Sequence, residues 1–136
     1  MTEPTKILVI DDNEGDWLLY ERCLQRSAGA TYAVSEAVSG EDGLVCIDKE
    51  TFDCVLLDYS LPGRNGVEIL KRIRVKHPFL PVVMLTGSDY EKAAIAAMRE
   101  GAQNYLTKEN IDSETLTHAI QDAIRHCMPQ NRGVEQ

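Results

Sequence analysis

Short apolar runs recur along the chain, and each ends abruptly on polar residues. Three of them, residues 7–10, 54–57 and 82–85, hold four consecutive apolar side chains each. Such runs are too short for typical helices, and with turn signals beside them they predict buried β-strands. Two weaker stretches, residues 31–38 and 104–107, also predict strands. In the first of these, apolar residues are mixed with polar ones, which suits the edge of a sheet.

Between these strands, apolar residues recur with helical spacing, and residues that favour helix ends mark five helices. The expected helices begin near Asn13, Ser39, Asn65, Ser88 and Asp112 or Ser113, and end near residues 27, 50, 76, 98 and 127. These starting side chains can accept hydrogen bonds from the open first turn of a helix, and Gly29 and Gly101 favour termination. The first helix has apolar side chains too densely placed for a buried face to be assigned.

Five strand–helix units in strict alternation predict a parallel sheet with right-handed crossovers and helices on both faces. Because all strands of such a sheet point the same way, the residues that follow them meet at one edge. Those residues are Asp11, Asp12, Asp58, Thr86 and Lys108. Taken alone, Asp58 also fits the simple start of a turn. Its convergence with the other four residues indicates a functional site, since ligands bind at this edge of open α/β sheets.

Composition limits the class of protein and its partners. The 136 residues, 43% apolar and 26% charged, suit one globular domain with its own core. A net charge of −8 repels nucleic acid and anionic membranes, so we expect neither as a direct partner. Four cysteines without a C-x-x-C pair predict reduced thiols, and no apolar run approaches membrane-spanning length. These features predict a cytoplasmic protein.

Three carboxylates, a hydroxyl and an ammonium at one edge favour phosphoryl chemistry. Carboxylates about 4 Å apart repel by about 4 kcal/mol at an effective dielectric of about 20, so Asp11, Asp12 and Asp58 need a cation between them. Ligation by oxygen alone selects Mg²⁺, or Mn²⁺, over zinc. Lys108 and Thr86 would then hold phosphate oxygens. Asp58 is left as the nucleophile, and its attack on phosphorus would give an acyl phosphate.

The chain resembles the receiver domains of two-component response regulators, of the single-domain, chemotaxis-regulator type. The matching features are the pair Asp11 and Asp12, Asp58 within Leu-Leu-Asp-Tyr-Ser-Leu-Pro-Gly, the Thr86-Gly87 pair, and Lys108. The resemblance implies a receiver domain over residues 1–127, followed by a polar tail over 128–136. It implies a flavodoxin-like, doubly wound sheet of five parallel strands in the order 2-1-3-4-5. The first and third strands must be neighbours in any case if Asp11, Asp12 and Asp58 share a metal.

The resemblance also implies a role for each residue of the site. Asp58 would accept a phosphoryl group from a phosphohistidine of a sensor histidine kinase or a histidine phosphotransfer protein. Mg²⁺ would be held by Asp12, Asp58 and the backbone carbonyl of Ser60, with Asp11 acting mainly through water. Thr86 and Lys108 would hold the phosphoryl oxygens.

A receiver of this kind is a signalling module with weak self-catalysed phosphorylation and dephosphorylation, not an enzyme. Thr86 and Tyr105 would form its switch, with Tyr105 turning inward as Thr86 moves toward the phosphate. On pattern alone, Tyr105 also fits a partly buried strand tyrosine without a switching role. The fourth helix, last strand and last helix would bind a downstream protein that the sequence does not identify. We expect a monomer or a weak dimer.

One position departs from the family pattern, because Glu109 follows Lys108 where the family usually has proline. In receivers that lysine–proline bond is usually cis. A cis bond before a non-proline residue costs about 3–4 kcal/mol, against about 0.5–1 kcal/mol before proline. We therefore expect a trans bond here, with Asn110 or its neighbours forming the turn and Glu109 facing solvent.

Two other functions share parts of this pattern. An aspartyl-phosphate phosphatase or phosphotransferase of the haloacid dehalogenase type would need a second aspartate two residues after the nucleophile, where Ser60 stands. A flavin carrier would need a phosphate-binding loop after the first strand, where Asp11 and Asp12 would repel the phosphate. The histidines at 77, 118 and 126 lack metal-ligand spacing.

Overall fold

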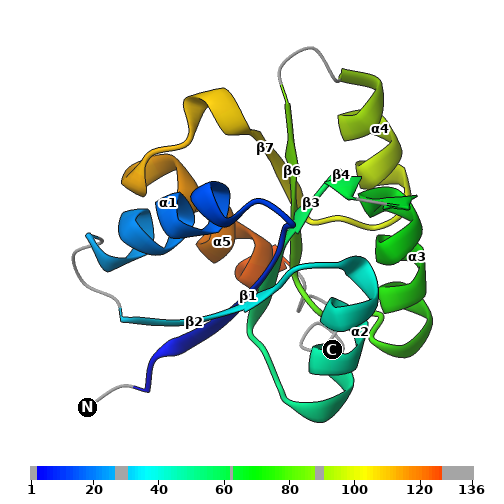
Figure 1. Cartoon of the computed structure of the whole chain (residues 1–136), viewed down its shortest axis with the longest axis horizontal. Helices are drawn as coiled ribbons and strands as arrows, with labels where there is room; N and C mark the ends of the chain where they lie inside the picture. The colour runs from blue at the N-terminus through cyan, green and yellow to red at the C-terminus, as the bar shows by residue number, and fades with distance from the viewer. Residues whose placement is uncertain (1–2, 27–30, 62, 88–90, 127–136) are drawn as a thin grey trace, which may run out of the picture.

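The computed structural model describes residues 3–26, 31–61, 63–87 and 91–126. The described residues form one parallel sheet of five strands: β1 (Thr5–Ile10), β2 (Tyr32–Ala37), β3 (Cys54–Asp58), β6 (Val82–Thr86) and β7 (Asn104–Thr107). Five α-helices flank it: α1 (Glu14–Gln25), α2 (Gly40–Lys49), α3 (Gly66–Lys76), α4 (Glu91–Arg99) and α5 (Ser113–His126). Figure 1 shows strands and helices alternating along the chain, as predicted.

The strands lie in the order β2-β1-β3-β6-β7, which is the predicted order 2-1-3-4-5 when only the strands of this sheet are counted. All four neighbouring pairs are parallel. Ile10 lies opposite Leu57, and Asp58 lies opposite Leu85. The carboxyl ends of β1, β3 and β6 therefore finish side by side at one edge. The predicted edge strand is also confirmed, since β2 pairs only with β1 in the described sheet.

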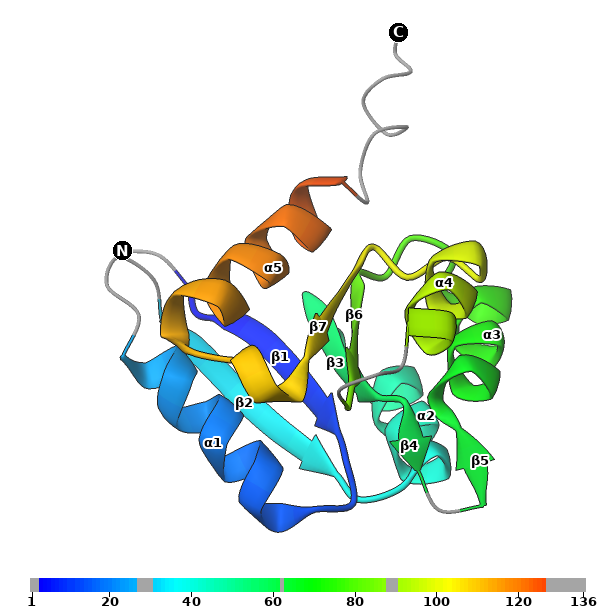
Figure 2. The ribbon, with the colours of Figure 1, turned by 90° about the horizontal axis from the view of Figure 1, so that it is seen from above.

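The helices form a layer on each face of the sheet. Figure 2 shows α1 and α5 on one face and α2, α3 and α4 on the other. Successive strand residues alternate between the two layers, so that Ile7 and Val9 pack toward α1 and α5 while Leu8 and Ile10 pack toward α2 and α3. Strands buried on both faces explain why the central runs are apolar throughout.

Most of the predicted helix starts are confirmed by their capping hydrogen bonds. The side chains of Asn13, Ser39, Asn65 and Asp112 accept hydrogen bonds from backbone N–H groups three residues further on, at 2.8–3.1 Å. The predicted cap at Ser88 and the stop at Gly29 lie outside the described residues. In α1, the buried face left open by the sequence consists of Tyr20, Cys23 and Leu24.

Two expectations drawn from composition can be compared with the described part of the chain. Cys23, Cys46 and Cys54 form no disulfide bond among the described residues. None of the described helices combines the length and the apolar character needed to cross a membrane.

A short hairpin follows β3 and was not predicted. Strand β4 (Ser60–Leu61) pairs antiparallel with β5 (Arg64–Asn65). Between them Gly63 takes a φ of 79°, a conformation that glycine adopts without steric strain. With two residues in each strand, the hairpin has no alternation that a sequence pattern could reveal. It carries the chain from Asp58 to the start of α3.

The peptide bond between Lys108 and Glu109 is trans, as predicted. The turn is a 3₁₀-helix, η1 (Lys108–Asn110), and Glu109 is exposed to solvent. A trans bond thus suffices to direct the Lys108 side chain back toward the edge of the sheet.

Gly66, the first residue of α3, packs directly against the backbone of Asp58 and Tyr59. Its N–H donates to the carbonyl of Tyr59 at 2.6 Å. A Cβ atom at position 66 would lie less than 3 Å from the Asp58 carbonyl oxygen and from the Tyr59 Cα. Only glycine therefore permits this close approach of α3 to the end of β3.

Arg74 joins α3 to two loops at the opposite end of the sheet. Its guanidinium donates to the carbonyls of His77 (3.0 Å), Leu80 (2.7 Å) and Gly101 (2.7 and 3.1 Å). It also donates to Oε1 of Gln103 at 2.7 Å, and the same oxygen accepts from the Val82 N–H at 2.8 Å. One partly buried cation thereby satisfies backbone groups that precede β6 and β7.

Candidate functional site

Three predicted carboxylates meet at the carboxyl ends of β1 and β3. Asp11 and Asp12 directly follow β1, and Asp58 is the last residue of β3. One carboxylate oxygen from each lies within 4.8 Å of the others. Asp11 and Asp58 are buried, with 0% and 3% of their surface exposed, whereas Asp12 is exposed. This arrangement offers a metal ion two buried oxygens and one accessible from solvent.

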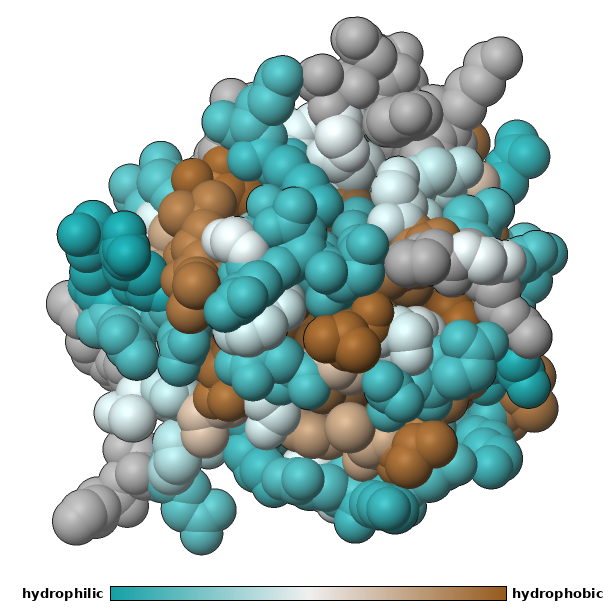
Figure 3. Space-filling model, viewed as in Figure 1, coloured by the Kyte–Doolittle hydropathy of each residue, from teal (hydrophilic) through white to brown (hydrophobic). Residues whose placement is uncertain are grey.

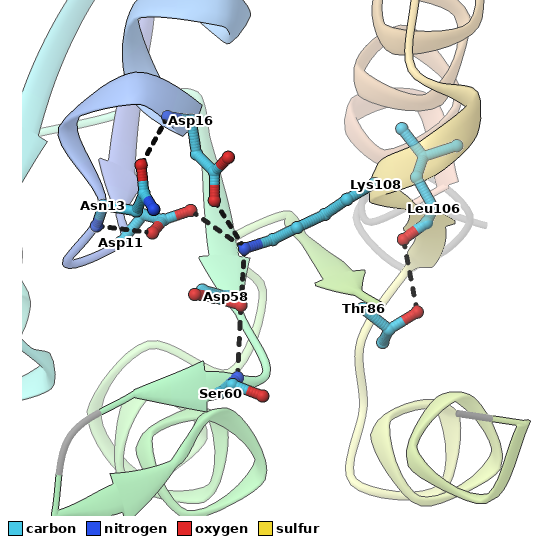
Figure 4. Close-up of polar contacts among 8 residues, drawn as sticks. All are labelled: Asp11, Asn13, Asp16, Asp58, Ser60, Thr86, Leu106 and Lys108. Atoms are coloured by element: carbon cyan, nitrogen blue, oxygen red, sulfur yellow. Dashed lines mark hydrogen bonds and ion pairs between the residues drawn. The ribbon is translucent and has the colours of Figure 1, made fainter. Parts of the chain in front are cut away.

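Lys108 reaches into this cluster from η1. Figure 4 shows its side chain extending between α1 and β3, with the ammonium surrounded by carboxylates. Its Nζ lies 3.2 Å from Oδ1 of Asp58 and 3.4 Å from Oδ2 of Asp11. Its shortest carboxylate contact, 2.8 Å, is with Oδ2 of Asp16 on α1. The predicted lysine is therefore part of the site, together with an aspartate that was not predicted.

Backbone N–H groups hold the two buried carboxylates in place. The N–H of Asn13 donates to Oδ1 of Asp11 at 2.9 Å, and the N–H of Ser60 donates to Oδ1 of Asp58 at 3.1 Å. Both follow from local sequence, because an aspartate commonly accepts from the backbone two residues further on. Oδ2 of Asp11 is buried, and among the described residues its one polar contact is the ion pair with Lys108.

The site strongly affects the protonation of its carboxylates. Burial raises the pKa of Asp11 to about 7, against the hydrogen bond from Asn13, and repulsion from Asp58 adds to the rise. Burial also raises the pKa of Asp58, although the charge of Lys108 lowers it. The raised pKa values of Asp11 and Asp58 indicate that the positive charge in the site is insufficient to stabilise both carboxylates in their ionised form.

The Lys108 ammonium is stabilised in its charged form. Burial lowers its pKa, but the hydrogen bond to Asp16 and the charges of Asp58 and Asp11 outweigh burial and raise it above its ordinary value. Lys108 is therefore a fixed positive charge within the acidic cluster. One such charge does not balance the carboxylates around it, and a divalent cation bound by oxygen ligands would.

Thr86 lies at the same edge, but its hydroxyl does not face Asp58. Thr86 ends β6 and is buried, and its Oγ1 donates to the carbonyl of Leu106 on β7 at 3.5 Å. Figure 4 shows the hydroxyl turned toward β7 and away from the carboxylates. The structure thus brings together Asp11, Asp12, Asp58 and Lys108 and leaves the Thr86 hydroxyl outside the group.

The two remaining predicted residues lie on β4 and β7. Ser60 is in β4 and lines an open hollow of about 770 Å³, together with Asp12, Tyr59, Leu61, Gly63, Asn65 and Glu68. Tyr105 is in β7 with 44% of its surface exposed, so it is more exposed than the partly buried strand tyrosine of the alternative interpretation.

Two residues of α1 that the sequence did not single out complete the surroundings of the cluster. Asp16 lies in the first turn of α1, where a negative charge suits the helix dipole. Tyr20 lies one turn further on and is fully buried, and its hydroxyl has no hydrogen-bond partner in the described part of the chain. Burial, and then the negative charges of Asp11 and Asp16, raise the pKa of Tyr20. In the sequence, only the spacing of four residues between Asp16 and Tyr20 indicates that the two side chains lie on the same face of the helix.

Comparisons with known proteins agree with this geometry. Residues 7–121 match the family model described as the response regulator receiver domain. The regulatory protein VanR of Enterococcus faecium is 39% identical over 103 residues, which are 76% of this chain and 43% of VanR. The DNA-binding transcriptional regulator NtrC of Salmonella typhimurium is 34% identical over 125 residues, 92% of this chain and 26% of NtrC. The chain thus spans less than half the length of either relative.

A solved structure shows the same fold over the full length of another chain. The crystal structure of a putative response regulator from Chloroflexus aurantiacus superposes with a TM-score of 0.82 at 33% identity, covering 91% of this chain and all of that one. The strand order, the acidic cluster with its lysine, and the family match over most of the residues lead to one conclusion. This chain belongs to the response regulator receiver domain family of two-component signalling systems.

Proposed function

We propose that Asp58 accepts a phosphoryl group from a phosphohistidine of a sensor histidine kinase or a histidine phosphotransfer protein. The observation that supports this most is the position of Asp58: a buried carboxylate at the end of β3, grouped with Asp11 and Asp12 and in contact with Lys108. The chain would act as a signalling module whose own contribution to phosphorylation and dephosphorylation is small.

The contacts of Asp58 favour one of its oxygens as the nucleophile. The Ser60 N–H and the Lys108 ammonium both approach Oδ1, and no backbone N–H or cationic side chain among the described residues contacts Oδ2. Oδ2 would attack phosphorus, forming an O–P bond as the P–N bond of the phosphohistidine breaks. The leaving imidazole nitrogen keeps the electron pair of that bond and takes up a proton from solvent. The products are an acyl phosphate and neutral histidine.

The metal expected at this site is Mg²⁺. Asp11, Asp12 and Asp58 would supply oxygen ligands, and Oδ2 of Asp11 is a buried acceptor that no described residue hydrogen-bonds, so the residues present fit such an ion. The backbone carbonyl of Ser60 is proposed as a further ligand. When bound, Mg²⁺ would neutralise charge on the carboxylates and on the phosphoryl oxygens. The Lys108 ammonium would bind a phosphoryl oxygen. The Thr86 hydroxyl would rotate away from the Leu106 carbonyl and donate a hydrogen bond to another phosphoryl oxygen.

Incubation with acetyl phosphate tests this proposal. In the presence of Mg²⁺, intact-mass measurement should show the addition of one phosphoryl group. Removal of the metal with EDTA should lower the initial rate at least about a hundredfold, because several kcal/mol of charge stabilisation are lost. Equal rates with and without metal would contradict the role of Mg²⁺. A folded protein that gains no phosphoryl group from acetyl phosphate or from a phosphorylated phosphotransfer domain would contradict the proposed function.

We further propose that phosphorylation changes a binding surface on α4, β7 and α5. Ile95 and Met98 on α4 and Tyr105 on β7 are exposed, with 44–56% of their surface accessible. On the face seen in Figure 3, apolar groups are separated by polar ones. Rotation of Thr86 toward the phosphoryl group would leave space beside β7 into which Tyr105 can turn.

This switch predicts a defined pattern of NMR shifts. On phosphorylation, amide resonances of Thr86, Met98 and Tyr105 should move, while that of Val45 on α2 should stay in place. Shifts confined to the surroundings of Asp58 would contradict the route through β6 and β7. A downstream protein partner, the monomeric or weakly dimeric state and the cytoplasmic location remain predictions. The haloacid dehalogenase alternative is not favoured by the family match.

A further inference from the structure

The Lys108 ammonium has a carboxylate partner outside the acidic cluster of Asp11, Asp12 and Asp58. Oδ2 of Asp16 lies 2.8 Å from Nζ, compared with 3.2 Å for Asp58 and 3.4 Å for Asp11. The contact with Asp16 also satisfies hydrogen-bond geometry. The ammonium is thus held most closely by α1, and Figure 4 shows Asp16 and Asp58 approaching it from different sides.

The local structure of α1 fixes the position of Asp16. Its backbone N–H donates to the side chain of Asn13, the residue that caps the helix, at 3.1 Å. About a third of the Asp16 side chain is exposed (31%), as is a quarter of the Lys108 side chain (25%). This ion pair is therefore partly open to solvent, beside the buried carboxylates of Asp11 and Asp58.

We infer that Asp16 is a positioning residue that competes with the phosphoryl group for Lys108, and thereby slows phosphorylation of Asp58. This inference rests on the proposed function. Lys108 has three N–H donors and three carboxylates around it, so a phosphoryl oxygen can bind only by displacing one of them. Asp16 is the partner that the chemistry of Asp58 does not need.

Phosphorylation by acetyl phosphate at saturating Mg²⁺ tests the inference through Asp16→Asn, which removes the charge and keeps the shape. The initial rate should rise about fivefold, the effect expected from loss of a partly exposed ion pair. Glu14→Gln is the matched control, since it removes an equal charge from the same turn of α1 at an exposed position. Its rate should stay close to that of the unmodified chain. Asp16→Ala should change the rate in the same direction as Asp16→Asn.

A double-mutant cycle separates competition for Lys108 from a general charge effect. In a Lys108→Ala background, Asp16→Asn should leave the phosphorylation rate unchanged. Urea unfolding of the parent, the two single variants and the double variant, all without metal, should also show coupling between positions 16 and 108. The folding equilibrium constant of the parent should be about three- to fivefold higher than the value expected if the two substitutions acted independently. This second measurement requires no phosphorylation.

The outcomes distinguish the inference from the proposed function. If the unmodified chain is not phosphorylated, the proposed function fails. If the chain is phosphorylated but Asp16→Asn is phosphorylated no faster than Glu14→Gln, Asp16 does not compete for Lys108. The same conclusion follows if Asp16→Asn raises the rate equally in the Lys108→Ala background. A slower Asp16→Asn would mean that Asp16 holds Lys108 in its productive position, which also overturns the inference.

Discussion

Replacement of Asp58 by asparagine should abolish phosphorylation by acetyl phosphate, because an amide oxygen is far too weak a nucleophile toward phosphorus. We expect intact-mass measurement to show no added phosphoryl group when the parent chain is fully modified. The folded state should survive the change. Burial raises the pKa of Asp58, so its charged form is costly in the fold, and removal of that charge should leave the free energy of unfolding equal or higher at neutral pH.

Asp53→Asn is the matched control for this experiment. Asp53 precedes the same strand at its opposite end, where its Oδ2 accepts from the backbone N–H of Lys6 at 2.8 Å. The asparagine can still accept that hydrogen bond, and the site is a full strand away, so phosphorylation should be unaffected. Full modification of the Asp58→Asn chain would show that another residue is the acceptor.

Replacement of Arg74 by methionine should lower the free energy of unfolding by about 3 kcal/mol, a large share of the roughly 5–15 kcal/mol typical of a domain. Methionine keeps the length and most of the apolar stem, so the loss isolates the guanidinium. The carbonyls of Leu80 and Gly101 would lose the guanidinium as donor, and that of His77 would retain only the Leu80 N–H at 3.3 Å. Oε1 of Gln103 would retain only the N–H of Val82. Urea unfolding followed by circular dichroism measures the change.

Arg72→Met provides the comparison within the same helix. Arg72 is exposed, two residues before Arg74. Its replacement should change the free energy of unfolding by less than about 0.5 kcal/mol, as is usual for surface positions. If both variants lose the same stability, the hydrogen bonds of Arg74 are not responsible, and the effect belongs to helix propensity or net charge.

The sequence allowed prediction of the fold and of the acidic cluster because both depend on periodic patterns. Apolar runs such as 54–57 identify buried strands, and parallel strands bring their following residues to one edge. Asp58 and Lys108 could therefore be placed together although they are 50 positions apart. The trans bond at Glu109 was equally predictable, since the energy of a peptide bond depends on the two residues it joins.

Other features depend on side-chain torsions or on contacts that leave no periodic signal. The ion pair between Lys108 and Asp16 joins residues 92 positions apart and follows from how a long, flexible side chain folds back from η1. The Thr86 hydroxyl turns to Leu106 through a choice of rotamer. The buried face of α1 was decided by packing against α5, since Leu18 and Leu24 carry the same side chain, yet only Leu24 is buried.

Gly66 is essential to the geometry of the site although it contributes no group to its chemistry. It carries no side chain and takes part in no step of phosphoryl transfer, yet α3 can begin against Asp58 only because position 66 is empty of side-chain atoms. A survey that ranks residues by reactive groups would pass over it. A loss of phosphorylation on substitution at 66 would therefore report a displaced strand end and not a missing reactant. Variation found at this position in related chains would accordingly be informative about backbone spacing at the acceptor, independently of which groups perform the chemistry.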